Sequence, residues 1–440
     1  MKVFDKDTMD SACKHCHIKD PGQVTIMESA ALAACLEKET GIPVIHMELG
    51  SPGLAPNRIG LEAEKKALDT ANVSAYPPTD GLPVLKEAAS RFAKAFLNLD
   101  FSPARCIPTT GSMLGAFAAF AACTQCTPGK NRVLVLEPSF SANKQQMAIL
   151  GIEWKGIEIA ECRGPLLESR LRSELSRGDV AAIIYSSPNN PSWMCLSDTE
   201  LQTIAKVAGE AGTVIIEDQA YFCMDFRQEG YDIPYRAPYP PSAARYTGDI
   251  IILLSGSKIF SYAGQRIGVM YIGRELYERC YPALASRYGG SGMFGLTITG
   301  GILDMITSGC TASTQWGLAA MMDASCDGTV NFVNDTRIYA ERASRMKEIF
   351  SSGGFNISYP DDAGGPVGDG FFFTLSYPGM DSNALISELM AYGISTVSLN
   401  KMGSSRHGVR VCSSRIRPDQ FTLLRERVEQ FSKDHPISKE

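Results

Sequence analysis

The chain has 440 residues, of which 44% are hydrophobic and 20% are charged, and its formal net charge is −6. A chain of this length is expected to fold into two domains, and its composition is typical of a soluble globular enzyme. The negative net charge gives no general attraction to nucleic acid or to an anionic membrane, so we expect neither as a partner.

The N-terminal residues 1–7 lack the continuous apolar core of a signal peptide. The most apolar run of the chain, residues 114–123, is far shorter than the ~20 residues needed to span a bilayer. The 13 cysteines are an odd number scattered along the chain, which is unlike a disulfide framework. We therefore expect a cytoplasmic protein without a membrane segment.

Cysteine and histidine cluster between Cys13 and His17, ahead of a helix predicted over residues 26–39. Both residue types are common metal ligands. However, neighbours in sequence cannot all face one ion without strain, and no second ligand pair follows at zinc-finger spacing. We therefore predict no metal site.

Turns near residues 50, 76 and 111 carry candidate site residues. Gly50 follows the strand-like residues 44–49, and Tyr76 precedes a loop rich in proline and glycine. The turn Gly111–Met113 opens an apolar helix, where free N–H groups and the positive end of the helix dipole suit an anion. Taken alone, ordinary turns and a capped core helix explain the same residues.

Two apolar runs predict buried strands that end in turns. The first begins at Arg132 and ends in a proline turn with Phe140, which taken alone would be a core residue. The second begins at Val180 and ends in a turn of proline and asparagine that contains Asn190.

A third run begins at Val214 and leads to Asp218, with Tyr221 three residues later. A carboxylate at the C-terminal end of a strand lies where open α/β sheets bind ligands. Strand-like and helical stretches alternate from about residue 130 to about residue 270, which predicts a parallel α/β sheet.

The stretch after the apolar run 250–254 places Ser255, Ser257 and Lys258 at a strand end, and Arg266 follows. A lysine partly desolvated there, near another cation, has a lowered pKa and is nucleophilic. Hydroxyls and a guanidinium are groups that bind phosphate. The alternative is a surface lysine and arginine beside an ordinary turn.

The chain from about residue 310 predicts long helices and then mixed strands, as expected for a smaller second domain. Near its end, Arg410 lies in a short predicted strand, with Arg406, Arg415 and Arg417 close by. Taken alone, Arg410 would be a surface residue. The segment 290–295 spells Gly-x-Gly-x-x-Gly, but no strand precedes it, so we predict a turn and not a dinucleotide site.

The lysine stretch resembles the cofactor-binding segment of the fold type I pyridoxal-phosphate-dependent aminotransferases of class I/II, which are similar to aspartate aminotransferase. That pattern, Ser-x-Ser-Lys followed by Gly-x-Arg-x-Gly, is filled at Ser255, Ser257, Lys258, Gly264, Arg266 and Gly268. Further matches follow in the expected order from Gly50 to Arg410. The Asn-Pro-x-Asn-Pro-Thr-Gly loop of the family matches at Pro188, Asn190 and Pro191, but Ser187, Ser192 and Trp193 depart from it.

The resemblance implies an α/β fold of fold type I, with a large domain around a mainly parallel seven-stranded sheet flanked by helices and a smaller α+β domain. It implies that residues 1–50 join the small domain, that residues 51–305 form the large domain, and that residues 306–440 form the small domain. It also implies a homodimer with shared active sites.

The resemblance further implies roles for individual residues. Lys258 holds pyridoxal 5'-phosphate as a Schiff base, Asp218 pairs with the pyridine nitrogen, and Tyr221 bonds the phenolic oxygen. The other implied cofactor contacts are Gly111, Ser112, Met113, Phe140, Asn190, Ser255, Ser257, Arg266 and, from the partner subunit, Tyr76. Gly50, Asn190 and Arg410 are implied to bind the substrate, with Arg410 on its carboxylate.

The activity implied is transfer of an amino group between an L-amino acid and a 2-oxo acid. One alternative is a C–S β-lyase or related elimination enzyme on the same cofactor. Another is a MocR-type ligand sensor, which is disfavoured because the residues before Gly50 lack a basic helix pair. The side-chain specificity has no readable code; Arg287 is a candidate for binding a second substrate carboxylate.

Overall fold

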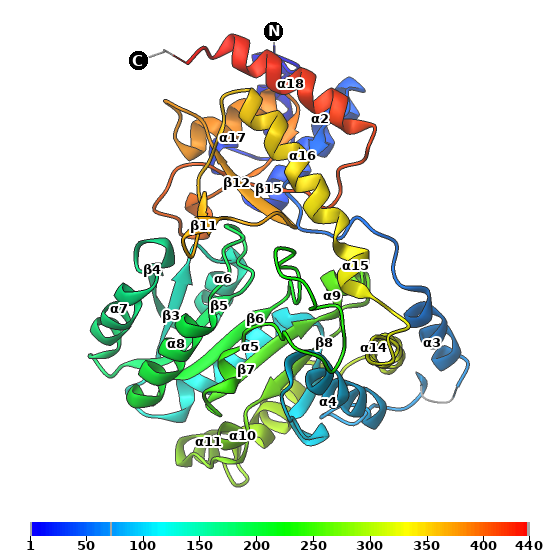
Figure 1. The fold of residues 1–440 in the computed structure, drawn as a ribbon, viewed down its shortest axis with the longest axis vertical. Coiled ribbons are helices and arrows are strands. Elements are labelled where there is room, and N and C mark those ends of the chain that lie inside the picture. Colours follow the sequence, from blue (N-terminus) through cyan, green and yellow to red (C-terminus); the bar gives the residue numbers. More distant parts are fainter. Residues whose placement is uncertain (1, 71–72, 438–440) are drawn as a thin grey trace.

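The computed structural model describes residues 2–70 and 73–437. The chain forms two lobes, and Figure 1 shows a large lobe around a central sheet with a smaller lobe stacked on it. Both ends of the described chain lie in the small lobe. None of the helices in the described residues is long and apolar enough to cross a membrane.

The large lobe is built on a seven-stranded sheet in the order β2-β8-β7-β6-β5-β3-β4. Neighbouring strands from β4 to β7 are parallel, whereas β8 is antiparallel to both β7 and β2. The predicted mainly parallel seven-stranded sheet is thus confirmed. The strands are β2 (Cys106–Thr109), β3 (Arg132–Glu137), β4 (Glu153–Glu158), β5 (Val180–Ser186), β6 (Val214–Gln219), β7 (Ile250–Ser255) and β8 (Gly268–Ile272).

Both faces are buried over the central strands of this sheet, which explains why β5 and β7 are apolar runs without polar alternation. In β7, for example, Ile250 and Ile252 pack into the core on one face, and Ile251 and Leu253 into the core on the other. The covering helices are α5 (Gly111–Cys126), α6 (Ser141–Ile149), α7 (Pro165–Leu175), α8 (Asp198–Ala211), α10 (Arg274–Glu278), α11 (Pro282–Tyr288), α12 (Phe294–Leu296), the π-helical η7 (Thr297–Leu303) and α13 (Asp304–Thr307).

A second group of helices packs at the β2 edge of the large lobe. It consists of α3 (Arg58–Leu68), α4 (Pro83–Leu97) and α14 (Ala312–Cys326), with the one-turn helix α9 (Gly256–Ile259) and α15 (Phe332–Thr336) nearby. Because α14 packs on α3 and α4, we propose that the large lobe extends beyond the predicted boundary at residue 305, to about residue 336.

The small lobe has one core that draws residues from both ends of the chain, from Phe4 to Met47 and from Ala343 to Phe431. Its sheet has the order β14-β15-β12-β9, and β1 pairs with β13. The elements are α1 (Lys6–His15), α2 (Ile26–Thr40), β1 (Ile45–His46), α16 (Ile338–Ser352), β9 (Asn356–Ile357), β10 (Asp361–Asp362), β11 (Gly365–Pro366), β12 (Phe372–Ser376), α17 (Ser382–Ala391), β13 (Ile394–Ser395), β14 (Val397–Ser398), β15 (Val409–Cys412) and α18 (Gln420–Asp434).

Candidate active site

A cavity of about 930 Å³ lies where the C-terminal ends of β6 and β7 meet the small lobe. This is the edge at which parallel α/β sheets bind ligands. Of the residues predicted for the site, all but Gly111 and Tyr76 line this cavity: Gly50, Ser112, Met113, Phe140, Asn190, Asp218, Tyr221, Ser255, Ser257, Lys258, Arg266 and Arg410.

Lys258 lies in the one-turn helix α9, directly after β7. Ser255 starts this turn, because its hydroxyl accepts a hydrogen bond of 3.1 Å from the Ser257 amide. The Lys258 Nζ donates to the Gly50 carbonyl and lies 5.3 Å from the ring centre of Phe371. Burial lowers the pKa of Lys258 to about 8, so its amine is far more often neutral and nucleophilic near neutral pH than that of an ordinary lysine.

Asp218 lies near the C-terminal end of β6, on the floor of the cavity. Its carboxylate accepts a hydrogen bond of 3.1 Å from the Ala220 amide. Among the described residues, no cationic group lies within 4.0 Å of it. Burial raises the pKa of Asp218 to about 6, against the opposing effects of the Ala220 amide and the Lys258 charge. Asp218 is therefore a carboxylate without a cationic partner.

Arg266 and the N-terminus of α5 converge on one side of the cavity. Gly111 has a φ of +71°, and a Cβ atom there would lie 2.5 Å from Nη2 of Arg266. A Cβ on Gly268 would lie 2.7 Å from the carbonyl oxygen of Leu254. Only glycine allows these approaches, which bring a guanidinium beside the free N–H groups of a helix start. This is an arrangement that binds phosphate.

Arg410 is 1% exposed and projects from β15 into the cavity. Its Nη1 donates to Asn190 Oδ1 at 3.2 Å, its Nη2 donates to the Glu48 carbonyl, and its Cζ lies 4.4 Å above the ring of Phe372. In the described chain its Nε has no hydrogen-bond partner. Burial lowers the pKa of Arg410. A buried guanidinium without a carboxylate partner is suited to bind a substrate carboxylate.

The arginines near Arg410 in sequence lie outside the cavity lining. Arg406 stacks on Tyr359, at 4.6 Å from the ring centre, and donates to the Ser358 carbonyl at 2.6 Å. Arg417 forms an exposed ion pair with Asp419 at 3.0 Å. Of Arg410 and the three arginines near it in sequence, only Arg410 lines the cavity among the described residues.

Trp193, where the family pattern has glycine, adopts a left-handed conformation with a φ of +65°. The indole is 1% exposed, and its ring lies 5.3 Å from that of Tyr221 and 6.3 Å from that of Phe372. A Cβ on Gly370 would collide with the indole. The loop therefore accommodates Trp193 because Gly370 leaves room for it, and Asn190 still lines the cavity.

Two residues considered in the sequence analysis, Tyr76 and Arg287, do not line the cavity of their own chain. Tyr76 is 88% exposed. Arg287 lines a separate hollow with residues 124–129 at the C-terminal end of α5, whereas Ser112 and Met113 lie at the opposite end of that helix. Because α5 has 16 residues, its two ends are about 24 Å apart. Arg287 therefore does not reach the cavity of its own chain.

Residues that the sequence reasoning missed line the outer part of the cavity. They come from the start of α2, from α6, from the edge strand β4, from the small-lobe sheet and from the 3-10 helix η8 (Asn400–Met402). They include Met27, Gln145, Trp154, Phe372, Val397 and Lys401. No sequence motif identifies these residues. Gln145 alone had an indirect signal, because its helix α6 begins directly after Phe140, which the resemblance had singled out.

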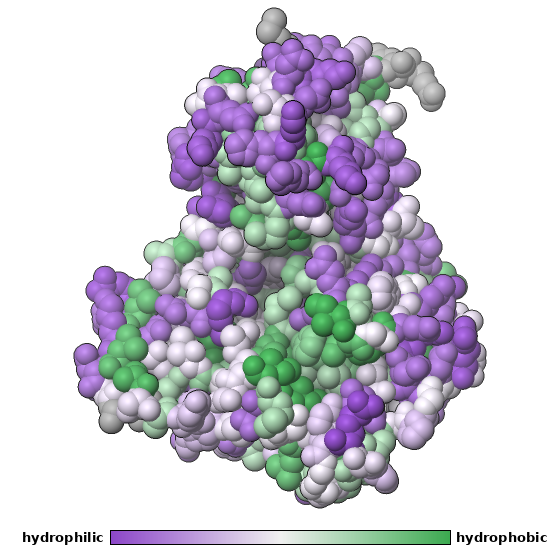
Figure 2. All heavy atoms as spheres, turned by 180° about the vertical axis from the view of Figure 1, so that it is seen from behind, coloured by the Kyte–Doolittle hydropathy of each residue, from purple (hydrophilic) through white to green (hydrophobic). Residues whose placement is uncertain are grey.

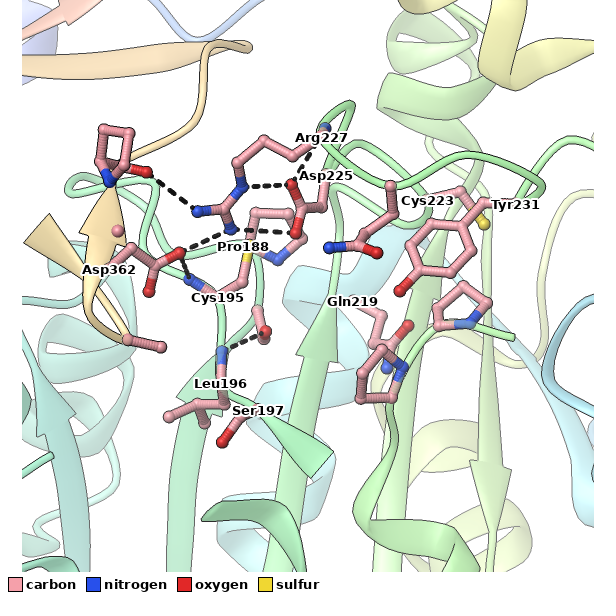
Figure 3. A pocket seen from close by; sticks show the side chains of 17 residues that line it. Pro188, Cys195, Leu196, Ser197, Gln219, Cys223, Asp225, Arg227, Tyr231 and Asp362 are labelled. Atoms are coloured by element: carbon pink, nitrogen blue, oxygen red, sulfur yellow. Dashed lines mark hydrogen bonds and ion pairs between the residues drawn. The ribbon is translucent and has the colours of Figure 1, made fainter. Parts of the chain in front are cut away.

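A second cavity, of about 350 Å³, lies beside the loop that carries Asn190 (Figure 3). Asp362, from the β10–β11 hairpin of the small lobe, accepts hydrogen bonds from Arg163 at 2.9 Å, Arg227 at 2.6 Å and the Cys195 amide at 3.0 Å. These contacts fasten the hairpin to the large lobe. They also hold one end of the Asn190 loop.

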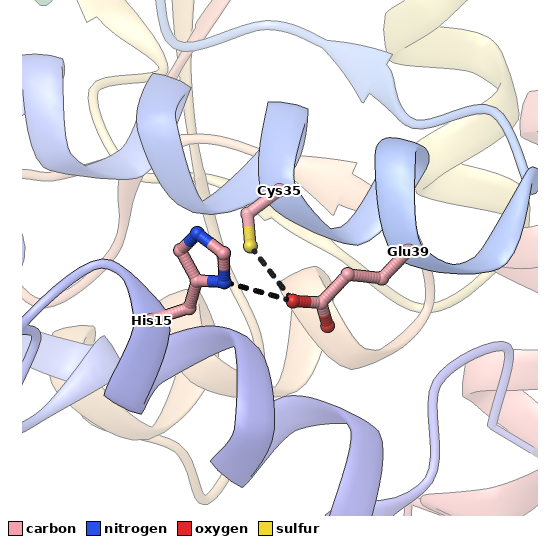
Figure 4. Close-up of side chains that lie close together, drawn as sticks. All are labelled: His15, Cys35 and Glu39. Carbon is pink, nitrogen blue, oxygen red and sulfur yellow. Dashed lines mark hydrogen bonds and ion pairs between the residues drawn. The ribbon is translucent and has the colours of Figure 1, made fainter.

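One residue of the cluster between Cys13 and His17, His15, lies close to two side chains of α2 (Figure 4). His15 lies beside Cys35 and Glu39 of α2: Glu39 Oε1 is 3.3 Å from His15 Nδ1 and accepts a hydrogen bond of 3.4 Å from the Cys35 thiol. All three are metal-ligand types, but these contacts account for the arrangement without an ion. The absence of a metal site stays a prediction.

A family model described as "Aminotransferase class I and II" matches residues 51–415. The chain belongs to this family. Its members generally depend on pyridoxal phosphate. Among curated relatives, the probable aspartate aminotransferase of Methanocaldococcus jannaschii is 25% identical over 232 residues, which cover 53% of this chain and 58% of that protein.

Two further relatives have different substrates in their names. The probable N-succinyldiaminopimelate aminotransferase of Mycobacterium tuberculosis is 28% identical over 209 residues, covering 47% of this chain and 50% of that protein. The probable N-acetyl-LL-diaminopimelate aminotransferase of Bacillus subtilis is 25% identical over 235 residues, covering 53% and 56%. This chain thus spans only about half the length of the curated relatives it matches.

Solved structures match over nearly the whole chain. Aspartate aminotransferase of Thermus thermophilus with maleate has a TM-score of 0.73 at 18% identity, covering 93% of this chain and 96% of that one. Aspartate aminotransferase of Thermotoga maritima has a TM-score of 0.74 at 20% identity, covering 93% and 97%. The predicted aspartate aminotransferase-like fold type I is confirmed.

Proposed function

We propose that the protein is a pyridoxal-phosphate-dependent aminotransferase that moves an amino group between an L-amino acid and a 2-oxo acid. The observation that carries this proposal is the convergence of Lys258, Asp218 and Arg410, from three separate elements, on one cavity. The family of the chain supports the same activity.

The residues around the cavity fit pyridoxal phosphate. Asp218, which has no cationic partner among the described residues, would pair with a protonated ring nitrogen. Arg266 and the turn Gly111–Met113 would hold the phosphate, with help from the hydroxyls of Ser255 and Ser257. Phe140 would stack on the ring, and Asn190 and Tyr221 would donate to the phenolic oxygen. When bound, this cofactor supplies an electron sink for electrons released at the substrate Cα.

The residues of the chain would bind and orient the substrate and move its proton. Arg410 would bind the substrate carboxylate through its planar fork, beside Asn190 and the Gly50 backbone. Lys258, whose low pKa favours the neutral amine, would hold the cofactor covalently. Once free, the same amine would act as general base and acid at the substrate Cα.

We further propose a homodimer in which Tyr76 acts in the neighbouring active site. Hydrophobic side chains gather on the back of the large lobe (Figure 2), and Leu296, Met305 and Ile306 are exposed by 53%, 71% and 47%. A Cβ on Gly309 would lie 3.3 Å from Pro77, so this segment adjoins the Tyr76 loop. A second copy of the chain covering this surface would bury these hydrophobic side chains. The buried surface would then lie beside the predicted phosphate-binding turn, Gly111–Met113.

A cytoplasmic location also remains a proposal. All thirteen cysteines lie in the described part of the chain and are free. Free thiols persist where the surroundings are reducing, as in the cytoplasm.

An absorption spectrum of the purified protein, followed by amino acids added singly without any 2-oxo acid, tests the activity. We expect a cofactor band that one amino acid shifts, with release of a single equivalent of its 2-oxo acid. Lys258→Ala should lose turnover, whereas the exposed Lys433→Ala should retain it. Continuous release of pyruvate and ammonia would instead assign a lyase, and substantial transamination by Lys258→Ala would contradict the role of this lysine.

A further inference from the structure

The active-site cavity extends beyond Arg410 along a wall made by the small lobe. Val397 lies directly opposite Arg410 in the sheet register of β14 and β15, and it lines the cavity. The start of α2 is fixed next to it, because the Ser29 hydroxyl bonds the Ser395 hydroxyl and the Thr396 carbonyl, each at 3.0 Å. This fixes Met27 on the cavity wall beside the proposed carboxylate anchor.

The opposite wall belongs to the large lobe. It begins at Phe140, which precedes the first residue of α6, and continues along that helix through Gln145 and Ala148. It ends at Trp154, on the edge strand β4. The two walls thus start at the proposed positions of the substrate carboxylate and of the cofactor ring, and they lead outward to Met27 and Trp154.

Both terminal side chains are large, apolar and exposed. Met27 is 71% exposed and Trp154 is 40% exposed. Exposed apolar side chains lining a cavity mark a surface that a ligand covers, because contact with an apolar ligand removes them from water. A large apolar substrate side chain has enough apolar area to cover both, whereas a methyl group offers little.

The charges of the lining argue against other substrate classes. The cavity is lined by one acidic side chain, Asp218, and by five cationic ones: Lys144, Lys258, Arg266, Lys401 and Arg410. A cationic substrate side chain would therefore be repelled. Beyond Arg266 and Arg410, the described lining offers no second arginine fork for a side-chain carboxylate. Lys144 is already paired with Glu137, and Lys401 is exposed to water, where a single charge binds a carboxylate weakly.

We propose, on the basis of the proposed function, that the substrate is an amino acid with a large, uncharged, mainly apolar side chain, which lies between Met27 and Trp154. Aromatic and long aliphatic amino acids belong to this class. Arg410 then fixes the carboxylate, and the two apolar walls select the side chain.

The test measures kcat/KM for the change in cofactor absorbance with L-phenylalanine, L-methionine, L-alanine, L-aspartate and L-lysine. Phenylalanine or methionine should exceed alanine by about tenfold or more, because burying a large apolar group discriminates by at least this factor. Trp154→Ala and Met27→Ala should each lower the ratio of phenylalanine to alanine several-fold. Ile149→Ala, which removes a 76% exposed side chain at the end of α6 outside the cavity lining, should leave that ratio unchanged.

The outcomes separate this inference from the proposed function. If amino acids change the cofactor spectrum but lysine or aspartate is preferred, or if neither cavity variant moves the ratio, the substrate class is wrong and the aminotransferase activity stands. If no amino acid changes the spectrum of the cofactor-loaded protein, both are wrong.

Discussion

Replacing Asp218 with asparagine should stabilise the cofactor-free protein while removing its activity. Burial raises the pKa of Asp218 from 3.8 to about 6, so the folded chain holds its proton across a pH range in which the unfolded chain has lost it. The free energy of unfolding therefore falls as the pH rises from about 4 to about 6, and the loss is complete at pH 7. A shift of about 2 pKa units corresponds to at most about 3 kcal/mol.

Asparagine keeps the shape of the side chain and carries no charge, so Asp218→Asn should gain up to this amount at pH 7 and gain little near pH 4. Urea unfolding of the apoprotein at both pH values measures the difference. As a control, Asp361→Asn alters an exposed carboxyl group and should change stability by less than about 0.5 kcal/mol. An Asp218→Asn variant less stable than the wild type at pH 7 would refute the view that this carboxylate lacks a partner in the empty site.

Other predictions follow from the same geometry. Arg410→Lys should lower kcat/KM at least tenfold in steady-state assays, since a point charge cannot replace a planar fork. Covalent capture of pyridoxal phosphate by the apoprotein, followed by absorbance, should rise with pH around 8, the pKa to which burial lowers Lys258, and not near 10.5. Thermal melts should show Trp193→Gly to be more stable than Trp193→Ala, because glycine relieves the left-handed backbone while both variants lose the same indole. Mixing Tyr76→Ala chains with Lys258→Ala chains should recover about a quarter of the sites, since only a mixed dimer rebuilds one complete site; no recovery would contradict a contribution across subunits.

The residues at the strand ends could be predicted from the sequence because each follows an apolar run. Asp218 is the penultimate residue of one buried strand and Lys258 follows the next, and parallel neighbours bring their C-terminal ends to the same edge. The role of Arg410 could be predicted only from the family pattern, because a single arginine in a short strand has no distinguishing sequence signal. The structure then separates it from Arg406 and Arg417, which are engaged elsewhere.

The outer cavity could not be predicted because its residues are far apart in the sequence. Met27 and Trp154 belong to different lobes, and nothing in the spacing around either residue indicates that they share a cavity. The proposed extension of the large lobe beyond residue 305 has no signal in the sequence for a related reason. Helix α14 is buried on nearly all sides, so its pattern does not reveal that α3 and α4 are the helices it packs against.

Trp193 shows how a departure from the family pattern can leave the site intact. Glycine adopts a left-handed backbone without strain, and tryptophan at residue 193 adopts it while filling space. That space exists because Gly370, at the start of the small-lobe sheet, has no side chain. The indole in turn packs on Tyr221 and Phe372, and Phe372 lies beneath the Arg410 guanidinium. The substitution therefore ties the Asn190 loop to the residues around Arg410, so that both groups proposed to hold the substrate carboxylate depend on one aromatic contact between the lobes.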